Sequence, residues 1–298
     1  MKKLIFLLSP LLFLISCSTT QKSQEPEIGF AEVNGTELYY EVVGSGEPLL
    51  FIHGNFGDIR HWDSQIEAFK DKFKVLRFDV RGYGKSAVPD KTNSYRDCDD
   101  ARALMDYLEI ERAHICGLSM GSGIAIDFAL AYPERCISLI PIGPWPNGWG
   151  GGDYRTVATD SMWTIFGTVV KLVRSEGPKA ATDYWWAGDH EIKTTVVKTS
   201  TLDSLLKIGY EYSWWGFLNP SKRKYYSPPA VEVLGNIDTP TLIVTSDNDI
   251  KACKEAADLM YEQIPNAQLV SISNAGHCMN MDNPHEFNRI VFDFIASL

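Results

Sequence analysis

The chain has 298 residues, of which 45% are hydrophobic and 22% are charged. This composition excludes an intrinsically disordered protein and fits a globular α/β enzyme that carries an insertion. With 28 Lys and Arg against 38 Asp and Glu, the net charge is −10. No nucleic-acid partner is therefore expected, because phosphate contacts need clustered basic side chains.

The first 16 residues have the pattern of an export signal. Two lysines precede an apolar run over residues 4–15, which is too short and too interrupted to span a bilayer. The run ends in Leu-Ile-Ser-Cys, which resembles the lipobox of bacterial lipoproteins, whose cysteine is acylated and becomes the mature N-terminus. An ordinary signal peptide with a chance cysteine is the alternative. We expect a lipid on Cys17, a flexible tether over residues 17–27, and a protein anchored to a membrane of the bacterial cell envelope after export.

Five cysteines follow Cys17, and their spacing matches neither a zinc site nor a C-x-x-C pair. An exported protein can form disulfides, but an odd number leaves at least one thiol unpaired. No metal and no cofactor is expected.

Strand and helix patterns alternate from residue 28, which predicts a mainly parallel α/β sheet. The predicted strands are 38–43, 49–53, 74–80, 113–118, 136–142, 241–245 and 268–272. The predicted helices between and after them are 62–69, 95–108, 120–131, 251–264 and 285–295. Residues 144–236 show helical patches without a clear buried strand. The sequence thus predicts a core of residues 28–143 and 237–298, interrupted by one mostly helical insertion.

Gly117-Leu118-Ser119-Met120-Gly121 matches G-x-S-x-G between an apolar strand and a small-residue helix. This context is typical of a nucleophile elbow, a strained turn that lifts a serine hydroxyl above the sheet. The N-terminus of the helix also favours developing negative charge. The pentapeptide alone is a weak signal, and a plain tight turn is the alternative.

A serine at neutral pH needs a base and a group that orients the base. Asp247 and Asp249 follow the strand 241–245, and His277 follows the strand 268–272. The carboxyl ends of parallel strands meet at one rim of a sheet, so we expect these side chains near Ser119. A serine followed by an acid and then a histidine is also the chain order of an α/β-hydrolase triad.

Three further segments strengthen a resemblance to the α/β-hydrolase superfamily, within it the esterase, lactonase and haloperoxidase-like branch. They are Phe-Ile-His-Gly-Asn at 51–55, Asp-Val-Arg-Gly-Tyr-Gly-Lys-Ser at 79–86 and Pro-Thr-Leu-Ile-Val at 240–244. The likeness covers residues 28–298 except the insertion. It implies an α/β-hydrolase fold, with a mainly parallel central sheet flanked by helices and a mostly helical cap over residues 144–236.

The resemblance also assigns catalytic roles. It implies Ser119 as nucleophile, His277 as general base, and Asp249 as the acid that orients the imidazole, since the family's acid is the last carboxylate of its turn. Asp247 is the rival acid, because Ser246 stands where the family commonly has glycine.

Two backbone N–H groups would form the oxyanion hole. One belongs to Met120, directly after the nucleophile, and the other to Asn55 in the loop after the His-Gly strand. Phe56 is a lesser candidate for the second donor.

The insertion holds seven of the eight tryptophans. Caps of this family cover the active site and shape its pocket, so an apolar or aromatic substrate is expected. Trp145 and Trp149 enter the insertion nearest the catalytic rim, which makes them candidate substrate contacts together with Phe56. Packing within the cap's own core is the alternative for these rings.

The predicted function is a serine hydrolase that cleaves a small carboxylic ester or lactone through an acyl-enzyme. Thioesterase, aminopeptidase, carbon–carbon bond hydrolase and perhydrolase activities on the same triad are alternatives, as is a non-catalytic ligand-binding protein. Epoxide hydrolases and haloalkane dehalogenases are disfavoured, because they need an aspartate where Ser119 stands.

Overall fold

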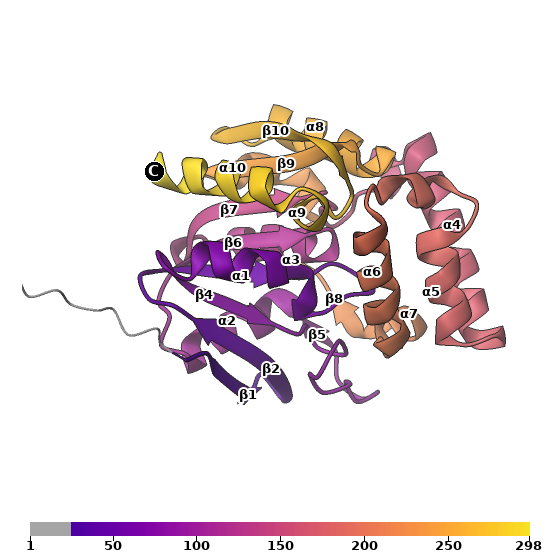
Figure 1. Cartoon of the computed structure of the whole chain (residues 1–298), viewed down its shortest axis with the longest axis horizontal. Helices are drawn as coiled ribbons and strands as arrows, with labels where there is room; N and C mark the ends of the chain where they lie inside the picture. The colour runs from indigo at the N-terminus through magenta and orange to yellow at the C-terminus, as the bar shows by residue number, and fades with distance from the viewer. Residues whose placement is uncertain (1–24) are drawn as a thin grey trace, which may run out of the picture.

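A computed structural model describes residues 25–298 (Figure 1). The predicted signal peptide and Cys17 lie outside the described residues. Within residues 25–298, the search for a helix both long and apolar enough to cross a bilayer finds none.

The centre of the molecule is an eight-stranded sheet in the order β1-β2-β4-β3-β6-β7-β9-β10. Its strands are β1 (Glu27–Val33), β2 (Thr36–Val43), β3 (Glu47–Ile52), β4 (Phe73–Phe78), β6 (Ala113–Leu118), β7 (Cys136–Ile142), β9 (Thr241–Asn248) and β10 (Ala267–Gly276). β2 runs antiparallel to β1 and β4, whereas every pairing from β4 to β10 is parallel. This is the mainly parallel sheet that the sequence predicts.

Helices flank the sheet on both faces. They are α1 (Asp63–Phe69), α2 (Asp97–Tyr107), α3 (Met120–Ala131), α8 (Lys251–Gln263), α9 (Met279–Asp282) and α10 (Pro284–Ala296). Right-handed crossovers place α1 on one face and α2, α3 and α8 on the other, because the strand order changes direction between β3 and β6. The loops after β3 and β6 therefore meet at a topological switch point, where open α/β sheets bind ligands.

The cap segment is helical and lies beyond the ends of the sheet strands, at the right of Figure 1. Its main elements are α4 (Val157–Ser175), α5 (Pro178–Ala187), the 3-10 turn η4 (Glu191–Thr195), α6 (Thr199–Glu211) and α7 (Trp215–Leu218). A two-residue strand of the cap, β8 (Arg223–Lys224), pairs in parallel with β5 (Tyr95–Arg96) of the core. The cap is thus joined to the core by a small second sheet.

Three predicted boundaries are corrected. Glu27 begins β1, so it is not part of the tether. The sequence does not predict β1, because Ala31 is the only buried residue of this strand. Tyr95 and Arg96 form β5 instead of the first turn of α2, because they pair with β8 more than 100 residues later. β9 runs on to Asn248 instead of ending at residue 245, because it stays paired with β10.

All five cysteines within the described residues are buried and free. All five, Cys98, Cys116, Cys136, Cys253 and Cys278, belong to the main apolar core. They act there as small hydrophobic residues.

Candidate active site

Ser119 occupies a sharp turn between β6 and α3. Its backbone has φ = 54° and ψ = −112°, a conformation that residues other than glycine rarely adopt. A Cβ atom on Gly121 would clash with the carbonyl oxygen of Ile52, and one on Gly117 would clash with that of Gly121. Both glycines are needed because strand and helix approach this closely. The G-x-S-x-G pattern therefore forms a nucleophile elbow and not a plain turn.

The end of β7 contacts both the turn at Ser119 and the side chain of His277. Ser119 N donates to Ile142 O at 2.8 Å, and the next residue, Gly143, lies against the imidazole. A Cβ atom on Gly143 would stand 2.8 Å from His277 Cε1 and 3.4 Å from Asp249 Oδ2. A glycine is required here because any larger side chain would displace the histidine ring.

Asp249 holds the histidine. His277 Nδ1 lies 2.6 Å from Asp249 Oδ1, and both side chains are almost fully buried. The carboxylate also accepts from Thr245 Oγ1 at 3.1 Å and from Ile250 N at 2.7 Å. Because Nδ1 donates to the carboxylate, Nε2 is left as the imidazole atom that can accept a proton.

Asp247 points elsewhere. It is exposed, and its Oδ2 accepts from Asn274 N at 3.3 Å. The serine at position 246 has a role of its own, because Ser246 Oγ donates to Gly276 O at 2.8 Å and ties the acid turn to the histidine loop. The geometry therefore pairs His277 with Asp249 and not with Asp247.

The loop after β3 carries the second predicted oxyanion residue. Asn55 Oδ1 accepts from Tyr83 OH at 2.6 Å, which fixes the loop. Met120 is the first residue of α3, so its N–H has no acceptor within the helix. His53 shapes the same loop: its Nε2 accepts from Val80 N at 3.0 Å, and its Nδ1 donates to Gly54 O at 2.8 Å.

Burial lowers the pKa of His53 to about 4, so the ring is neutral at physiological pH. Both of its nitrogens are engaged by backbone groups, which leaves neither for catalysis.

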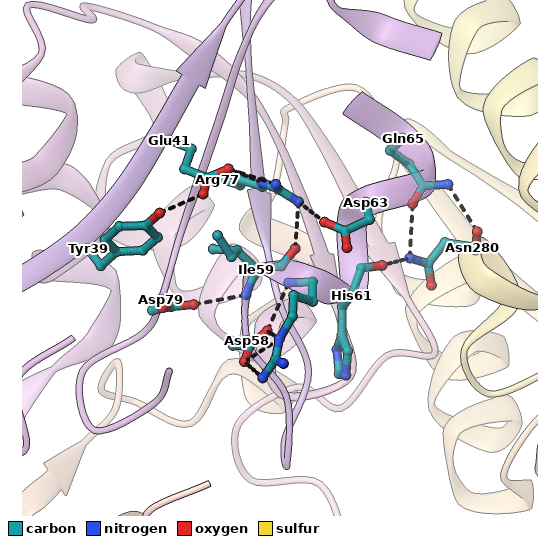
Figure 2. Close-up of polar contacts among 11 residues, drawn as sticks. Tyr39, Glu41, Asp58, Ile59, His61, Asp63, Gln65, Arg77, Asp79 and Asn280 are labelled. Carbon is teal, nitrogen blue, oxygen red and sulfur yellow. Dashed lines mark hydrogen bonds and ion pairs between the residues drawn. The ribbon is translucent and has the colours of Figure 1, made fainter. Parts of the chain in front are cut away.

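A network of hydrogen bonds connects the segment that follows the loop after β3 to other parts of the core (Figure 2). Asp79 Oδ1 accepts from Ile59 N at 2.9 Å, so the segment 79–86 is tied to the turn that follows the oxyanion loop. Asn280 Nδ2 donates to His61 O at 2.6 Å, and Gln65 Nε2 donates to Asn280 O at 3.0 Å. These bonds connect the segment after β3 to α9, which directly follows the loop of His277.

The cap also bonds to the histidine loop. His277 N donates to Thr195 O at 2.8 Å. Asp282 is fully buried, and its Oδ2 accepts from Gly276 N at 2.9 Å and from Val197 N at 3.3 Å, while its Oδ1 accepts from Lys198 N at 3.3 Å. One carboxylate thus holds both the loop of His277 and the cap. The sequence carries no local signal for this contact, because its two sides meet only when the cap has folded.

The family of the chain is settled by comparison with known proteins. A family model described as the alpha/beta hydrolase fold matches residues 47–284. The chain belongs to this family. The predicted α/β-hydrolase fold is confirmed.

Two relatives of this α/β-hydrolase family member have names that describe hydrolysis. A 3-oxoadipate enol-lactonase of Acinetobacter baylyi is 25% identical over 269 residues, which cover 90% of this chain and 92% of that protein. A 2-hydroxy-6-oxononadienedioate/2-hydroxy-6-oxononatrienedioate hydrolase of Paraburkholderia xenovorans is 27% identical over 298 residues, covering 95% of this chain and 97% of that protein.

Solved structures agree on the fold. An esterase from a Rhodococcus species superposes with a TM-score of 0.77 at 21% identity, covering 91% of this chain and 99% of that one. An enol-lactonase from Burkholderia xenovorans gives a TM-score of 0.72 at 23% identity, covering 90% and 100%. At this identity the likeness shows the shared α/β-hydrolase fold.

Aromatic residues line the boundary between core and cap in this α/β hydrolase. Phe56 is buried, and its ring lies 4.4 Å from that of Trp185 and 4.9 Å from those of Trp214 and Phe217. Phe56 therefore anchors the oxyanion loop to the cap. Its backbone has φ = 57°, so the loop turns sharply at this residue.

The two candidate tryptophans differ in their surroundings. Trp145 is half-buried beside the elbow, where its backbone N donates to Ser122 Oγ at 3.0 Å. Trp149 is buried, and its Nε1 donates to Ala252 O of α8 at 3.0 Å. The structure thus places the ring of Trp149 in packing against α8, contrary to the expected substrate contact, because its indole N–H finds a partner there.

One group of potential metal ligands lies within the described residues: Asp249, Cys253 and His277. The carboxylate and the imidazole are already bonded to each other. Burial raises the pKa of the Cys253 thiol well above its usual value, so the thiolate that would bind a metal is disfavoured. The group is better explained as an acid–base pair beside a packed thiol.

Proposed function

We propose that the protein is a serine hydrolase that cleaves a carboxylic ester or lactone. The observation that carries the proposal is the 2.6 Å contact between His277 Nδ1 and Asp249 Oδ1, at the same rim of the sheet as a serine held at φ = 54°. A histidine oriented by a buried carboxylate next to an elbow serine is the arrangement used for acyl transfer. A relative named as an enol-lactonase supports lactone cleavage, and one named as a dienedioate hydrolase supports hydrolysis in general.

In the proposed reaction, His277 Nε2 takes the proton of Ser119 Oγ while the oxygen attacks the substrate carbonyl. The N–H groups of Met120 and Asn55 stabilise the negative charge on the carbonyl oxygen. Asp249 stabilises the imidazolium, which then protonates the leaving alcohol. A water molecule, deprotonated by the same imidazole, hydrolyses the acyl-enzyme and regenerates Ser119.

The test is a fluorophosphonate probe together with turnover of p-nitrophenyl butyrate. The wild-type protein should be labelled on Ser119 and should hydrolyse the ester. Ser119→Ala should lose both properties. Labelling of the buried Ser122 instead, or equal turnover by Ser119→Ala, would refute the assignment.

We also propose that Cys17 is acylated and anchors the protein to the bacterial cell envelope. This proposal depends on the lipobox-like Leu-Ile-Ser-Cys segment alone. Wild-type protein expressed with its first 16 residues should partition with membranes, and Cys17→Ser should move it to the aqueous fraction. Mass spectrometry that shows an unmodified Cys17 in the exported protein would contradict the proposal.

A further inference from the structure

A buried arginine of the cap lies beside the nucleophile turn. Arg223 Nε lies 2.7 Å from Asp97 Oδ2, and the two side chains are 12% and 5% exposed. Arg223 Nη1 lies 3.5 Å from Sδ of Met120, the residue directly after Ser119. Arg223 Nη2 is buried and has no hydrogen-bond partner among the described residues.

A second unpaired donor lies close by. Tyr212 is 4% exposed, and its hydroxyl finds no partner within residues 25–298. Its ring stacks on that of Tyr83 at a centroid distance of 4.5 Å. The Tyr83 hydroxyl donates to Asn55, so this group of side chains borders both candidate oxyanion residues.

Three polar atoms, from Tyr212, Tyr83 and Arg223, lie around Gly216. A Cβ atom built there would lie 3.4 Å from Tyr212 OH, 3.7 Å from Tyr83 OH and 3.9 Å from Arg223 Nη2. These are ordinary van der Waals distances, so a methyl group on residue 216 would fit between the three polar atoms without displacing them. Buried donors without an acceptor cost free energy. The arrangement is therefore suited to an acceptor group supplied by a ligand.

We propose that Arg223 and Tyr212 bind a carboxylate of the substrate, so that the substrate is an ester or lactone that also carries a carboxylate group. This inference rests on the proposed function. A carboxylate fits because its two oxygens accept from a guanidinium and a hydroxyl at once, and such charge-assisted bonds are stronger than neutral ones. Asp97 balances the charge of Arg223 on the Nε side, and the neighbouring Arg81 is balanced by Asp100 at 2.6 Å.

The test compares two esters of equal chain length, mono-p-nitrophenyl adipate and p-nitrophenyl hexanoate, after subtraction of spontaneous hydrolysis. They differ only in that a carboxylate replaces the terminal methyl group. The wild-type kcat/KM should be at least about tenfold higher for the adipate, as expected for a hydrogen bond to a charged group. Equal values for the two esters would overturn the inference and leave the serine mechanism standing. Absence of Ser119-dependent turnover of both esters would instead refute the proposed function.

Two variants address the carboxylate site itself. Tyr212→Phe removes a hydroxyl that has no protein partner, so a structural role predicts no change in the adipate-to-hexanoate ratio. Ligand binding predicts a fall of about tenfold. Gly216→Ala fills the space between the three polar atoms and should cause a similar fall. Tyr210→Phe is the matched control, because Tyr210 lies on α6 but is exposed. Equal ratios in Tyr212→Phe and Tyr210→Phe would overturn the assignment.

Calorimetry gives a readout that does not need turnover. Ser119→Ala protein should bind monomethyl adipate, and the double variant with Tyr212→Phe should bind it at least about tenfold more weakly. The same affinity in both proteins would count against the carboxylate site.

Discussion

The sheet rim and the cap differ in how many of their buried polar atoms have hydrogen-bond partners. On the rim, both carboxylate oxygens of Asp249 are bonded, and both nitrogens of His53 have backbone partners. Among residues 25–298, most buried side-chain atoms without a partner belong to the cap or to core residues that face it: Tyr95, Asp97, Asp127, Trp185, Trp186, His190, Glu191, Tyr212, Trp214 and Arg223. The bonds around Asp249 and His53 hold these rim side chains in fixed positions, although His61, Trp62 and Asn280 also keep one unpaired atom each. The unpaired donors of the cap are suited to recognising a ligand.

The largest expected effect tests the rim. Asp249→Asn should lower kcat for p-nitrophenyl butyrate by about 10⁴-fold, because an amide no longer holds the imidazole in the required tautomer. Asp247→Asn is the matched control on the same turn and should change kcat by less than about twofold. The opposite ranking would transfer the acid role to Asp247 and break the distinction drawn between the two carboxylates.

The second prediction concerns Asp127, which lies where α3 meets the cap. Its Oδ2 accepts from Tyr226 N at 2.9 Å, and its Oδ1 has no partner in the described part of the chain. Burial raises the pKa of Asp127 from its ordinary 3.8 to about 7. The folded state therefore binds the proton more tightly, and this stability is lost as the pH rises from about 4 to about 7.

Asp127→Asn should consequently raise the free energy of unfolding at pH 8 by up to about 4 kcal/mol. This upper limit is the difference between the ordinary and the folded-state pKa of Asp127, multiplied by roughly 1.4 kcal/mol per pKa unit. At pH 4 the variant and the wild type should be nearly equal. Urea unfolding at both pH values measures this. The exposed Asp203→Asn is the control, and a variant that is less stable than wild type at pH 8 would contradict the prediction.

The third prediction tests the connection between cap and rim. Asp282→Asn should lower kcat/KM by about 10- to 100-fold, because the loop of His277 loses a bonded anchor. The far-UV circular dichroism spectrum of the variant should match that of the wild type, whereas a loss of activity through unfolding alone would change the spectrum. Asp258→Asn, an exposed change on α8, should alter neither quantity.

The smallest expected effect separates the two tryptophans. Trp149→Phe removes the bond to Ala252 O and should lower the free energy of unfolding by about 1 kcal/mol without changing the ranking of substrates. Trp145→Phe should change kcat/KM among acyl groups, by up to about 10-fold for a lost apolar contact. A ranking that changes with Trp149 and not with Trp145 would reverse the roles that their surroundings indicate.

The placement of Ser119, Asp249 and His277 at one rim of the sheet was predictable, because its signals are local. Two glycines mark the tight turn at Ser119, and parallel strands necessarily bring the residues that follow them to one rim. The choice of Asp249 over Asp247 came from family resemblance, and the structure explains it by burial. Arg223, Tyr212 and Asp282 were not predictable, because each meets its neighbours only through the folding of a segment whose helices have no fixed relation to the sheet pattern. Trp149 shows that position along the chain does not predict a substrate contact. It follows a strand that ends at the rim, but its side chain packs on α8.

The bond from His277 N to Thr195 O sets a condition on how substrates reach Ser119. A cap that lifts away as a rigid lid would break this bond and release Asp282 from Val197 and Lys198, so the imidazole would lose its alignment at the moment the serine became accessible. The bonds of Thr195, Val197 and Lys198 therefore couple the position of the cap to that of the loop that carries His277, and a rigid opening of the cap would be transmitted to this loop.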